Sequence, residues 1–404
     1  MSKKFSVGID IGTYQVKVIV AEQSDEAEDS SSPLRIIGVG LAESRGLRHG
    51  YIINCRDVTK SLSSAIEQAE KTSGQKIRNA SISIGGIGLS SITTAGSIMT
   101  SKSDSEITEL DVNNAIANAE DDLPKSVTQN KKILHTIPLT YKIDGKVVFG
   151  EPIGMHGDKL EVKVMFIVCT EHHFNDLIQA VEDLDINVTG YIASPLAGAV
   201  AVSTKTQRIA GCVVANIGSE TVSVVAFENN LPISLEVFSI GGTDITNDIA
   251  LGLRISLDEA EEVKIKQSDM EKEINYSRRK LDEIIVARLS DIFDLIEAHL
   301  KKIGRSGLLP AGIILTGGTS GLSTIEELAK ATLRLPTKIA SLNFSADQIK
   351  NGLVRDSSWL VAYGLCLIKS NKNGDYPFIS ENGIEINHGQ LWDKISHFFR
   401  KFSP

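Results

Sequence analysis

A turn between two apolar strands near the N-terminus carries residue types suited to phosphate chemistry. Residues 4–21 alternate apolar and other side chains and predict two strands, with Asp10 before the turn and Gly12 and Thr13 within it. Glycine lets backbone N–H groups approach an anion, and a carboxylate can hold Mg²⁺ or its waters. A purely structural hairpin would show the same pattern.

The same layout returns about 205 residues further along the chain. Residues 208–227 again predict two strands around a glycine turn, and Asn216, Gly218 and Thr221 are its polar and glycine positions. We interpret this repeat as an internal duplication. Two such hairpins that face each other would clamp a polyphosphate between two halves of the chain.

Two further residue pairs are candidates for contacts with a nucleoside. A predicted strand over 311–315 runs into Gly317 and Gly318, where the missing side chains would let a flat base and a ribose approach the backbone. Glu261 and Lys264 are one turn apart on a predicted helix over 256–266, so they share one face. A surface ion pair is the alternative interpretation of this second pair.

Residues 85–164 interrupt the pattern of the surrounding chain. Glycines gather at their start, a helix is predicted from Thr108 with Asp111 at the third capping-box position, and strands are predicted over 133–148 and 160–169. The strand and helix pattern of the preceding residues resumes near residue 168. We therefore expect a small inserted α+β subdomain.

The C-terminal residues have a different character. Residues 371–390 are polar, rich in glycine and asparagine, and predict a flexible linker, whereas residues 391–404 predict an amphipathic helix with a net charge of +2. An apolar face with a basic edge is typical of a helix that lies in a membrane interface. Docking on the protein's own core or on a partner is the alternative. The membrane-binding candidates are Leu391, Trp392, Lys394, Ile395, Phe398, Phe399, Arg400, Lys401 and Phe402.

Composition excludes several classes of protein. The chain has 404 residues, 42% of them hydrophobic and 23% charged, which is typical of a globular protein. Its formal net charge of -9 argues against a broad nucleic-acid-binding surface. The four cysteines form no CxxC pair, so we expect reduced thiols rather than a zinc site or a disulfide framework. No stretch approaches the 18 apolar residues of a membrane span.

In this order, the motifs resemble those of the actin-like ATPase superfamily, and within it the FtsA family of bacterial cell-division proteins. Residues 46–54 (GLRHGYIIN) and 311–318 (AGIILTGG) support the resemblance. It implies an α/β, duplicated ribonuclease-H-like fold, with two halves around a nucleotide cleft and an inserted subdomain, 1C. The expected divisions are 1–84, 165–200 and 355–370 (1A), 85–164 (1C), 201–245 and 308–354 (2A), 246–307 (2B), 371–390 (linker) and 391–404 (membrane-targeting helix).

The resemblance also implies ligands and partners. Such proteins bind ATP with Mg²⁺, polymerise on the cytoplasmic face of the inner membrane at the division septum, bind the C-terminal peptide of FtsZ, and recruit later division proteins. Asp10 is the expected metal-binding residue, and no residue can be named as catalytic. The expected nucleotide-binding residues are Asp10, Gly12, Thr13, Asn216, Gly218, Thr221, Gly241, Gly242, Glu261, Lys264, Gly317 and Gly318.

The second phosphate motif departs from the family pattern. Asn216 and Ser223 replace two aspartates, and Ser219 and Glu220 replace a glycine pair. Asparagine lacks the charge that organises the waters of Mg²⁺, and the Glu220 carboxylate would repel phosphate if it faced the cleft. We expect weakened Mg-ATP binding and little or no hydrolysis. If Glu220 points to solvent instead, nucleotide binding would survive.

Two other functions share this fold. A pilus-assembly scaffold like PilM would have the same body and a similar insertion, without a comparable membrane tail. A small-molecule kinase of the same superfamily would need an intact acidic Mg²⁺ site and a base for its substrate. Asn216 and Ser223 argue against the kinase.

Overall fold

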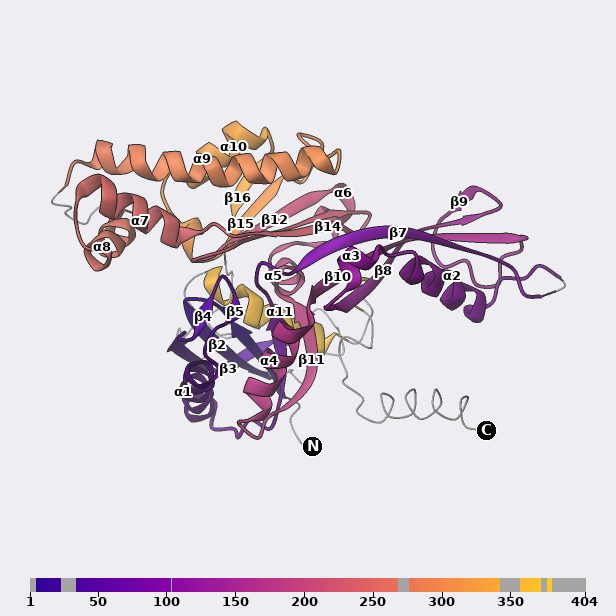
Figure 1. Cartoon of the computed structure of the whole chain (residues 1–404), viewed down its shortest axis with the longest axis horizontal. Helices are drawn as coiled ribbons and strands as arrows, with labels where there is room; N and C mark the ends of the chain where they lie inside the picture. The colour runs from indigo at the N-terminus through magenta and orange to yellow at the C-terminus, as the bar shows by residue number, and fades with distance from the viewer. Residues whose placement is uncertain are drawn as a thin grey trace.

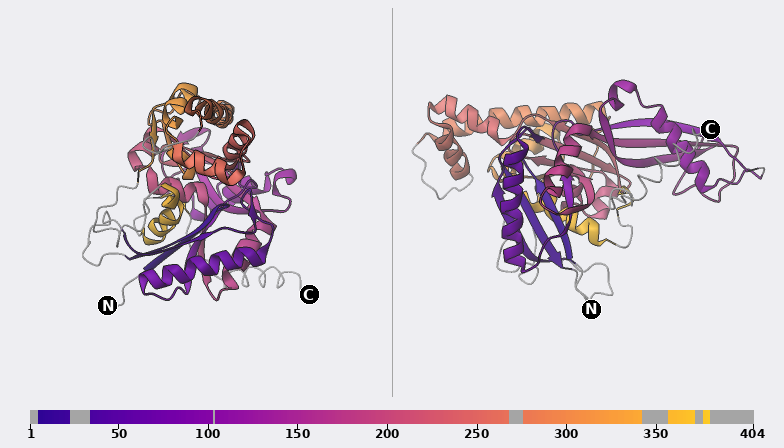
Figure 2. Two further views of the ribbon diagram at one scale, coloured as in Figure 1. Left: turned by 90° about the vertical axis from the view of Figure 1, so that its left-hand side faces the viewer. Right: turned by 60° about the horizontal axis from the view of Figure 1, so that its bottom comes forward.

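Three large sheets organise the part of the chain that the structure describes. The structure, a computed structural model, describes residues 5–22, 34–102, 104–267, 276–341, 357–371 and 376–379. Two of its sheets have five strands each. A sheet of four strands comes from residues 90–170, which are inserted between two strands of the first five-stranded sheet, and residues 47–52 form a two-stranded ribbon. Figure 1 shows the first five-stranded sheet below the second, with the four-stranded sheet extending to one side, and Figure 2 shows the arrangement from two further directions.

The first half is built on a sheet with strand order β11-β6-β1-β2-β3. Alternate residues of β2 face opposite sides of this sheet, as the strand period requires. Val18 and Val20 pack in a cluster with α1, whereas Ile19 and Ala21 pack in a cluster with α11. Its elements are β1 (Phe5–Ile11), β2 (Gln15–Glu22), β3 (Arg35–Glu43), β4 (Leu47–Arg48), β5 (Tyr51–Ile52), α1 (Cys55–Ser73), β6 (Asn79–Ile84), α4 (Glu171–Glu182), β11 (Asn187–Ala193), α5 (Ser194–Val202), η3 (Ser357–Trp359) and α11 (Leu360–Ser370).

The second half has the strand order β14-β13-β12-β15-β16. On β12, Val213 and Ala215 pack in a cluster with α9 and α10, whereas Cys212 and Val214 belong to a cluster shared with the first half. Its elements are α6 (Lys205–Ala210), β12 (Cys212–Ile217), β13 (Val222–Glu228), β14 (Leu231–Phe238), α7 (Gly242–Leu253), α8 (Leu257–Gln267), α9 (Arg278–Lys302), β15 (Ile313–Thr316), η1 (Gly318–Gly321), α10 (Ile325–Leu333) and β16 (Thr337–Ile339).

The two halves repeat one topology, which confirms the predicted duplication. β1 pairs antiparallel with β2 and parallel with β6, and β12 pairs antiparallel with β13 and parallel with β15. The hairpin turns match as well. The Gly12 N–H donates to the Gln15 carbonyl at 3.2 Å, and the Gly218 N–H donates to the Thr221 carbonyl at 2.9 Å.

Helix α11 is held between β1 and α5 through close backbone contacts at two glycines. A Cβ added to Gly8 on β1 would lie 2.3 Å from the Ala362 carbonyl oxygen. A Cβ on Gly364 of α11 would lie 1.8 Å from the carbonyl oxygen of Ala197 on α5. Larger residues at either position would therefore push α11 away from the strand or from the neighbouring helix.

The inserted sheet has the order β7-β10-β8-β9 and its own apolar core against α2. The predicted capping box of α2 is confirmed, with Thr108 and Asp111 exchanging hydrogen bonds. The sheet also contacts the second half, because the Ser91 hydroxyl donates to the Leu235 carbonyl and accepts from the Leu235 N–H. Its elements are β7 (Ser90–Met99), α2 (Glu109–Asp121), α3 (Lys125–Thr128), β8 (Lys131–Ile143), β9 (Lys146–Val148) and β10 (Lys159–Thr170).

Residues 376–379, here called the C-terminal clip, differ from the expected linker. Phe378 is 1% exposed and packs against Phe227 of β13, with ring centroids 5.5 Å apart. The guanidinium of Arg208, on α6, lies 5.4 Å from the Tyr376 ring centroid. The clip thus comes after α11 of the first half in the sequence but packs against the second half. The predicted membrane helix, 391–404, lies outside the described residues. Within the described ranges, no helix has the length and apolar character to cross a membrane.

A buried histidine adds a pH-sensitive contact beneath the inserted sheet. His135 of β8 is 1% exposed, and its Nε2 accepts a hydrogen bond from the Ala193 N–H at 3.1 Å. Burial disfavours the imidazolium and lowers the pKa of His135 to about 4. A proton on Nε2 would also remove this acceptor, so the native state requires the neutral ring.

The clip predicts a stability effect. Truncating Phe378 to alanine leaves a cavity in a fully packed site, so we expect Phe378→Ala to lower the unfolding free energy by about 3–5 kcal/mol. Pro377→Ala, at an exposed neighbour, is the matched control. Urea unfolding followed by circular dichroism measures the unfolding free energy of each variant. Equal midpoints for the two variants would show that the clip contributes nothing to the body.

His135 predicts a pH effect of defined sign. Its pKa is lowered on folding, so the unfolded chain binds more protons below pH 6.5 and stability falls as pH decreases toward 4. Protonation of His135 should lower the free energy of unfolding by about 3 kcal/mol in total. His135→Gln keeps an acceptor without titrating, and its unfolding free energy should decline less over this range. Parallel pH profiles for the two proteins would contradict the assignment.

Candidate functional site

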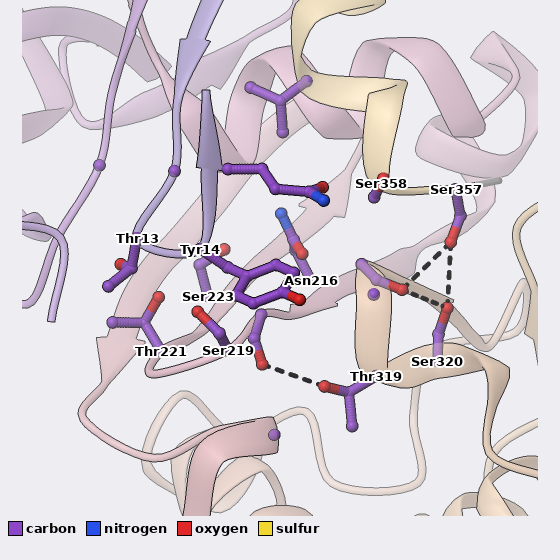
Figure 3. Close-up of a pocket in the computed structure, with 18 of the residues that line it drawn as sticks. Thr13, Tyr14, Asn216, Ser219, Thr221, Ser223, Thr319, Ser320, Ser357 and Ser358 are labelled. Atoms are coloured by element: carbon purple, nitrogen blue, oxygen red, sulfur yellow. Dashed lines mark hydrogen bonds between the residues drawn. The ribbon is translucent and has the colours of Figure 1, made fainter. Parts of the chain in front are cut away.

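A cleft of about 730 Å³ lies between the two halves. It is bordered by both hairpin turns, the start of α7, one face of α8, and the segment after β15, as the close-up in Figure 3 shows for part of its lining. Of the twelve predicted nucleotide-binding residues, Gly241 alone does not line it. Those that do are Asp10, Gly12, Thr13, Asn216, Gly218, Thr221, Gly242, Glu261, Lys264, Gly317 and Gly318.

The start of α7 is fixed to the second hairpin turn. The Gly242 N–H donates to the Gly218 carbonyl at 2.9 Å, and the Thr243 N–H donates to the Ser219 carbonyl at 2.7 Å. These bonds satisfy amides that a helix start otherwise leaves without an intrahelical partner. A Cβ on Gly241 would lie 2.5 Å from the Ser219 carbonyl oxygen. Gly241 therefore permits the contact between turn and helix rather than lining the cleft.

Asp10 is the carboxylate that the first half brings to the cleft. It accepts a hydrogen bond from the Ser83 hydroxyl at 2.7 Å and pairs across the hairpin with Lys17. Desolvation raises the pKa of Asp10, while the charge of Lys17 and the bond from Ser83 oppose that rise. Ser83 and Lys17 both line the cleft, and we did not predict them. Only the strand pairing places them beside Asp10.

The corresponding positions of the second hairpin are uncharged. Asn216 pairs with Ser223 in the register that Asp10 and Lys17 occupy in the first hairpin. A Cβ on Gly317 would lie 2.3 Å from Asn216 Oδ1, so a glycine there makes room for the amide. The duplicated site is therefore asymmetric, with its carboxylate and its ammonium group on the first hairpin.

Glu261 and Lys264 form the predicted pair, and it is more than a surface contact. Their charged groups are 2.7 Å apart, and the Lys264 side chain is only 11% exposed. Lys264 Nζ also donates to the Gly242 carbonyl at 3.0 Å and to the Thr246 hydroxyl at 2.8 Å. The pair thus connects α8 to the start of α7 and holds one ammonium group at the edge of the cleft.

A hydroxyl network lies where β15 meets η3. The Ser320 hydroxyl donates to the Gly317 carbonyl at 2.7 Å and lies 3.1 Å from the Ser357 hydroxyl. The Thr319 hydroxyl donates to the Gly218 carbonyl at 3.1 Å, and Figure 3 marks these contacts. The network fixes the glycine segment against the second turn. Single serines and threonines gave no sequence signal for it.

Tyr14 is another lining residue that we did not predict. It stands in the first turn, its side chain is 57% exposed, and Figure 3 shows its ring in the cleft beside Asn216. An exposed aromatic ring at a turn has no periodic pattern that would indicate its direction. The ring narrows the space between the two turns.

Glu220 corrects our expectation about the second phosphate motif. Glu220 is half-buried and does not line the cleft, and its carboxylate accepts a hydrogen bond from the backbone N–H of His49 in the first half. The expected repulsion of phosphate by this side chain therefore does not follow from the structure. Asn216, Ser219 and Ser223 do line the cleft, as the sequence predicts.

The cleft offers one carboxylate for a metal ion next to the turns. Among the described residues, no group of three or more His, Cys, Asp or Glu side chains is arranged to hold a metal. Mg²⁺ needs few protein ligands when phosphates and waters complete its shell. Asp10, with amide and hydroxyl groups nearby, fits an ion that arrives with a nucleotide better than an ion bound by the protein alone.

Solved structures show which fold this is. The chain matches the PilM-PilN type IV pilus biogenesis complex with a TM-score of 0.66 at 17% identity, covering 91% of this chain and 98% of the other. It matches MreB5 of Spiroplasma citri bound to ADP with a TM-score of 0.50 at 13% identity, covering 89% and 94%. At these identities the likeness concerns the fold alone, which is the predicted actin-like fold.

Sequence relatives show the family. A model described as cell division protein FtsA matches residues 213–364, and one described as the SHS2 domain inserted in FtsA matches residues 86–168. FtsA of Bacillus subtilis is 30% identical over 89% of this chain and 82% of its own length. FtsA of Borreliella burgdorferi is 30% identical over 91% and 92%, and FtsA of Pseudomonas aeruginosa 29% over 90% of both. The chain belongs to the FtsA family of cell-division proteins.

Proposed function

We propose that this protein is a membrane-anchored adaptor of cell division, which binds ATP in the cleft, polymerises, and tethers FtsZ to the cytoplasmic face of the membrane at the septum. The observation that carries the nucleotide part is the meeting of two duplicated glycine turns in one cleft. Backbone amides at both turns suit a polyphosphate. The family supports the division role.

In this proposal the polyphosphate lies between the turns that contain Gly12 and Gly218. Thr13 and Thr221 would donate hydroxyl hydrogen bonds, and Asp10 would hold Mg²⁺ through its carboxylate or bound waters. The ion would neutralise phosphate charge. Glu261 and Lys264 would contact the ribose side, and Gly317 and Gly318 would leave room for the adenosine.

The uncharged residues at positions 216 and 223 of the second hairpin argue for binding rather than catalysis. Asn216 and Ser223 place no second carboxylate beside the ion, and the neighbouring groups at this end are amides and hydroxyls. We therefore propose ATP binding with a weak dependence on Mg²⁺ and little hydrolysis. The same lack of a carboxylate at positions 216 and 223 disfavours a small-molecule kinase.

The membrane and partner parts of the proposal rest on the tail and on the family. Residues 391–404 have an apolar face and a basic edge, and they follow the clip after residues 380–390. One short amphipathic helix binds a membrane weakly, so several tails on one filament would hold it longer. FtsZ, further copies of this chain and later division proteins are the proposed partners. A PilM-like scaffold, the rival with this fold, would not be expected to recruit FtsZ.

Calorimetry tests the nucleotide site. We expect the purified chain to bind ATP, with affinities in Mg²⁺ and in EDTA that agree within about threefold, because Asn216 cannot support the ion as a carboxylate does. Asn216→Asp should raise the Mg²⁺-dependent affinity about tenfold, the scale of one hydrogen bond to a charged group. Asn113→Asp, exposed on α2, controls for charge. Loss of all wild-type affinity in EDTA would contradict this view of the hairpin.

Vesicle flotation tests the tether. The intact chain should float with vesicles that contain phosphatidylglycerol and should carry FtsZ with it, because the tail binds lipid and the body binds FtsZ. A chain that ends at Ile379 keeps the clip and should remain with FtsZ in the soluble fraction. Equal flotation of the two chains would overturn the membrane anchor. Flotation of the intact chain without FtsZ would overturn the tether.

A further inference from the structure

The segment between β4 and β5 lies against the second hairpin turn. The His49 N–H donates to the Glu220 carboxylate, and His49 Nδ1 lies 3.3 Å from the Glu220 carbonyl oxygen. His49 belongs to the first half and Glu220 to the second. We propose that this contact, here called the latch, holds the two halves closed at one end of the cleft and couples that closure to the root of the inserted sheet.

The backbone of His49 is consistent with a specific role. His49 has φ +48°, in the left-handed region that non-glycine residues seldom adopt, and Gly50 beside it has φ +79°. Such conformations persist when the surroundings fix them. Here the left-handed residue is the one whose N–H meets the Glu220 carboxylate. Hydrogen bonds to a charged acceptor are stronger than those between neutral groups, so this one can offset a modest backbone cost.

The other side of the same segment meets the root of the inserted sheet. The Ile87 N–H donates to the His49 carbonyl at 3.3 Å, and a Cβ on Gly50 would lie 2.4 Å from the Gly86 Cα. The Tyr51 hydroxyl lies 2.9 Å from the hydroxyl of Thr170, the last residue of β10. Movement of the second turn would therefore be passed through residues 49–51 to the strands that carry the insertion.

The latch also bears on the shape of the cleft. The Ser219 carbonyl, next to Glu220, accepts the Thr243 N–H, and the Gly218 carbonyl accepts the Gly242 N–H. The turn that reaches across to His49 thus also fixes the start of α7. Removing an interaction that only the closed state makes shifts the equilibrium toward the open state by the free energy of that interaction. Loss of the latch should favour an open cleft and a repositioned α7.

Other contacts keep the halves together when the latch is absent. The shared core beneath the cleft and the reciprocal bonds between Ser91 and Leu235 do not involve Glu220. A Glu220 variant should therefore fold normally and change the balance between open and closed forms. His49→Ala keeps the backbone donor, so its effect should be smaller than that of Glu220→Ala.

Pulsed electron paramagnetic resonance on the full chain without nucleotide tests the latch. Cys55, at the start of α1, is exposed and the other three cysteines are buried, so it accepts one spin label. Leu251→Cys on α7, at a position 79% exposed, places the second label on the other half. The distance distribution between the labels reports the opening of the cleft. Glu327→Ala, which removes an exposed glutamate on α10, is the matched control.

We expect one distance population in the parent and in Glu327→Ala. Glu220→Ala should add a longer population, with the ratio of closed to open forms reduced about tenfold, and Glu220→Gln should be intermediate. Distributions for Glu220→Ala and Glu220→Gln that match the control would overturn the latch. If Glu220→Ala does not fold, as judged by circular dichroism, Glu220→Gln decides the question alone.

A second readout uses the proposed ligand. Release of a fluorescent ATP analogue should be about tenfold faster from Glu220→Ala than from Glu327→Ala, because an open cleft loses the ligand more readily. Equal release rates would contradict the coupling of closure to ligand retention. This arm rests on the proposed function, whereas the distance measurement does not. Failure of the analogue to bind the parent chain would contradict ATP binding, and the distance measurement would still decide whether the latch exists.

Discussion

The cleft depends on the close packing of α11 against the rest of the body. Gly8 and Gly364 let α11 approach β1 and α5 to backbone contact, and α5 in turn packs on β12 and β13 of the second half. Because the two sheets share this apolar layer, their hairpin turns face each other across one space. The arrangement of polar groups in the cleft therefore follows from an apolar contact beneath it.

Duplication gives the cleft its shape, and divergence between the copies gives it its chemistry. Each half delivers a glycine turn with the same internal hydrogen bond, but only the first delivers a carboxylate beside an ammonium group. Burial raises the pKa of that carboxyl, Asp10, so keeping it ionised in the cleft has a cost in free energy. The second copy supplies Asn216 instead and uses Glu220 for a contact between the halves. In the proposed latch, the second half therefore supplies the carboxylate that keeps the cleft closed.

Local patterns in the sequence predicted most of the fold and of the cleft. Alternation predicted both hairpins, helical spacing predicted α8, and Thr108 with Asp111 predicted the start of α2. The sequence could not reveal contacts that depend on tertiary position. The direction of Glu220, the proximity of Ser83 to Asp10, and the burial of Phe378 after a polar stretch each follow from packing between distant segments, which carries no periodic signal.

Hydrogen exchange of the intact chain, measured with and without ATP, tests the central claim that two duplicated turns form one site. If the phosphates lie between them, ATP should slow exchange of the backbone amides in residues 12–15 and in residues 218–221 together. Peptides from the distal inserted sheet, such as residues 144–150, should be unchanged and serve as the internal control. Slower exchange in only one of the two turns, or in neither, would contradict a site shared by the two halves.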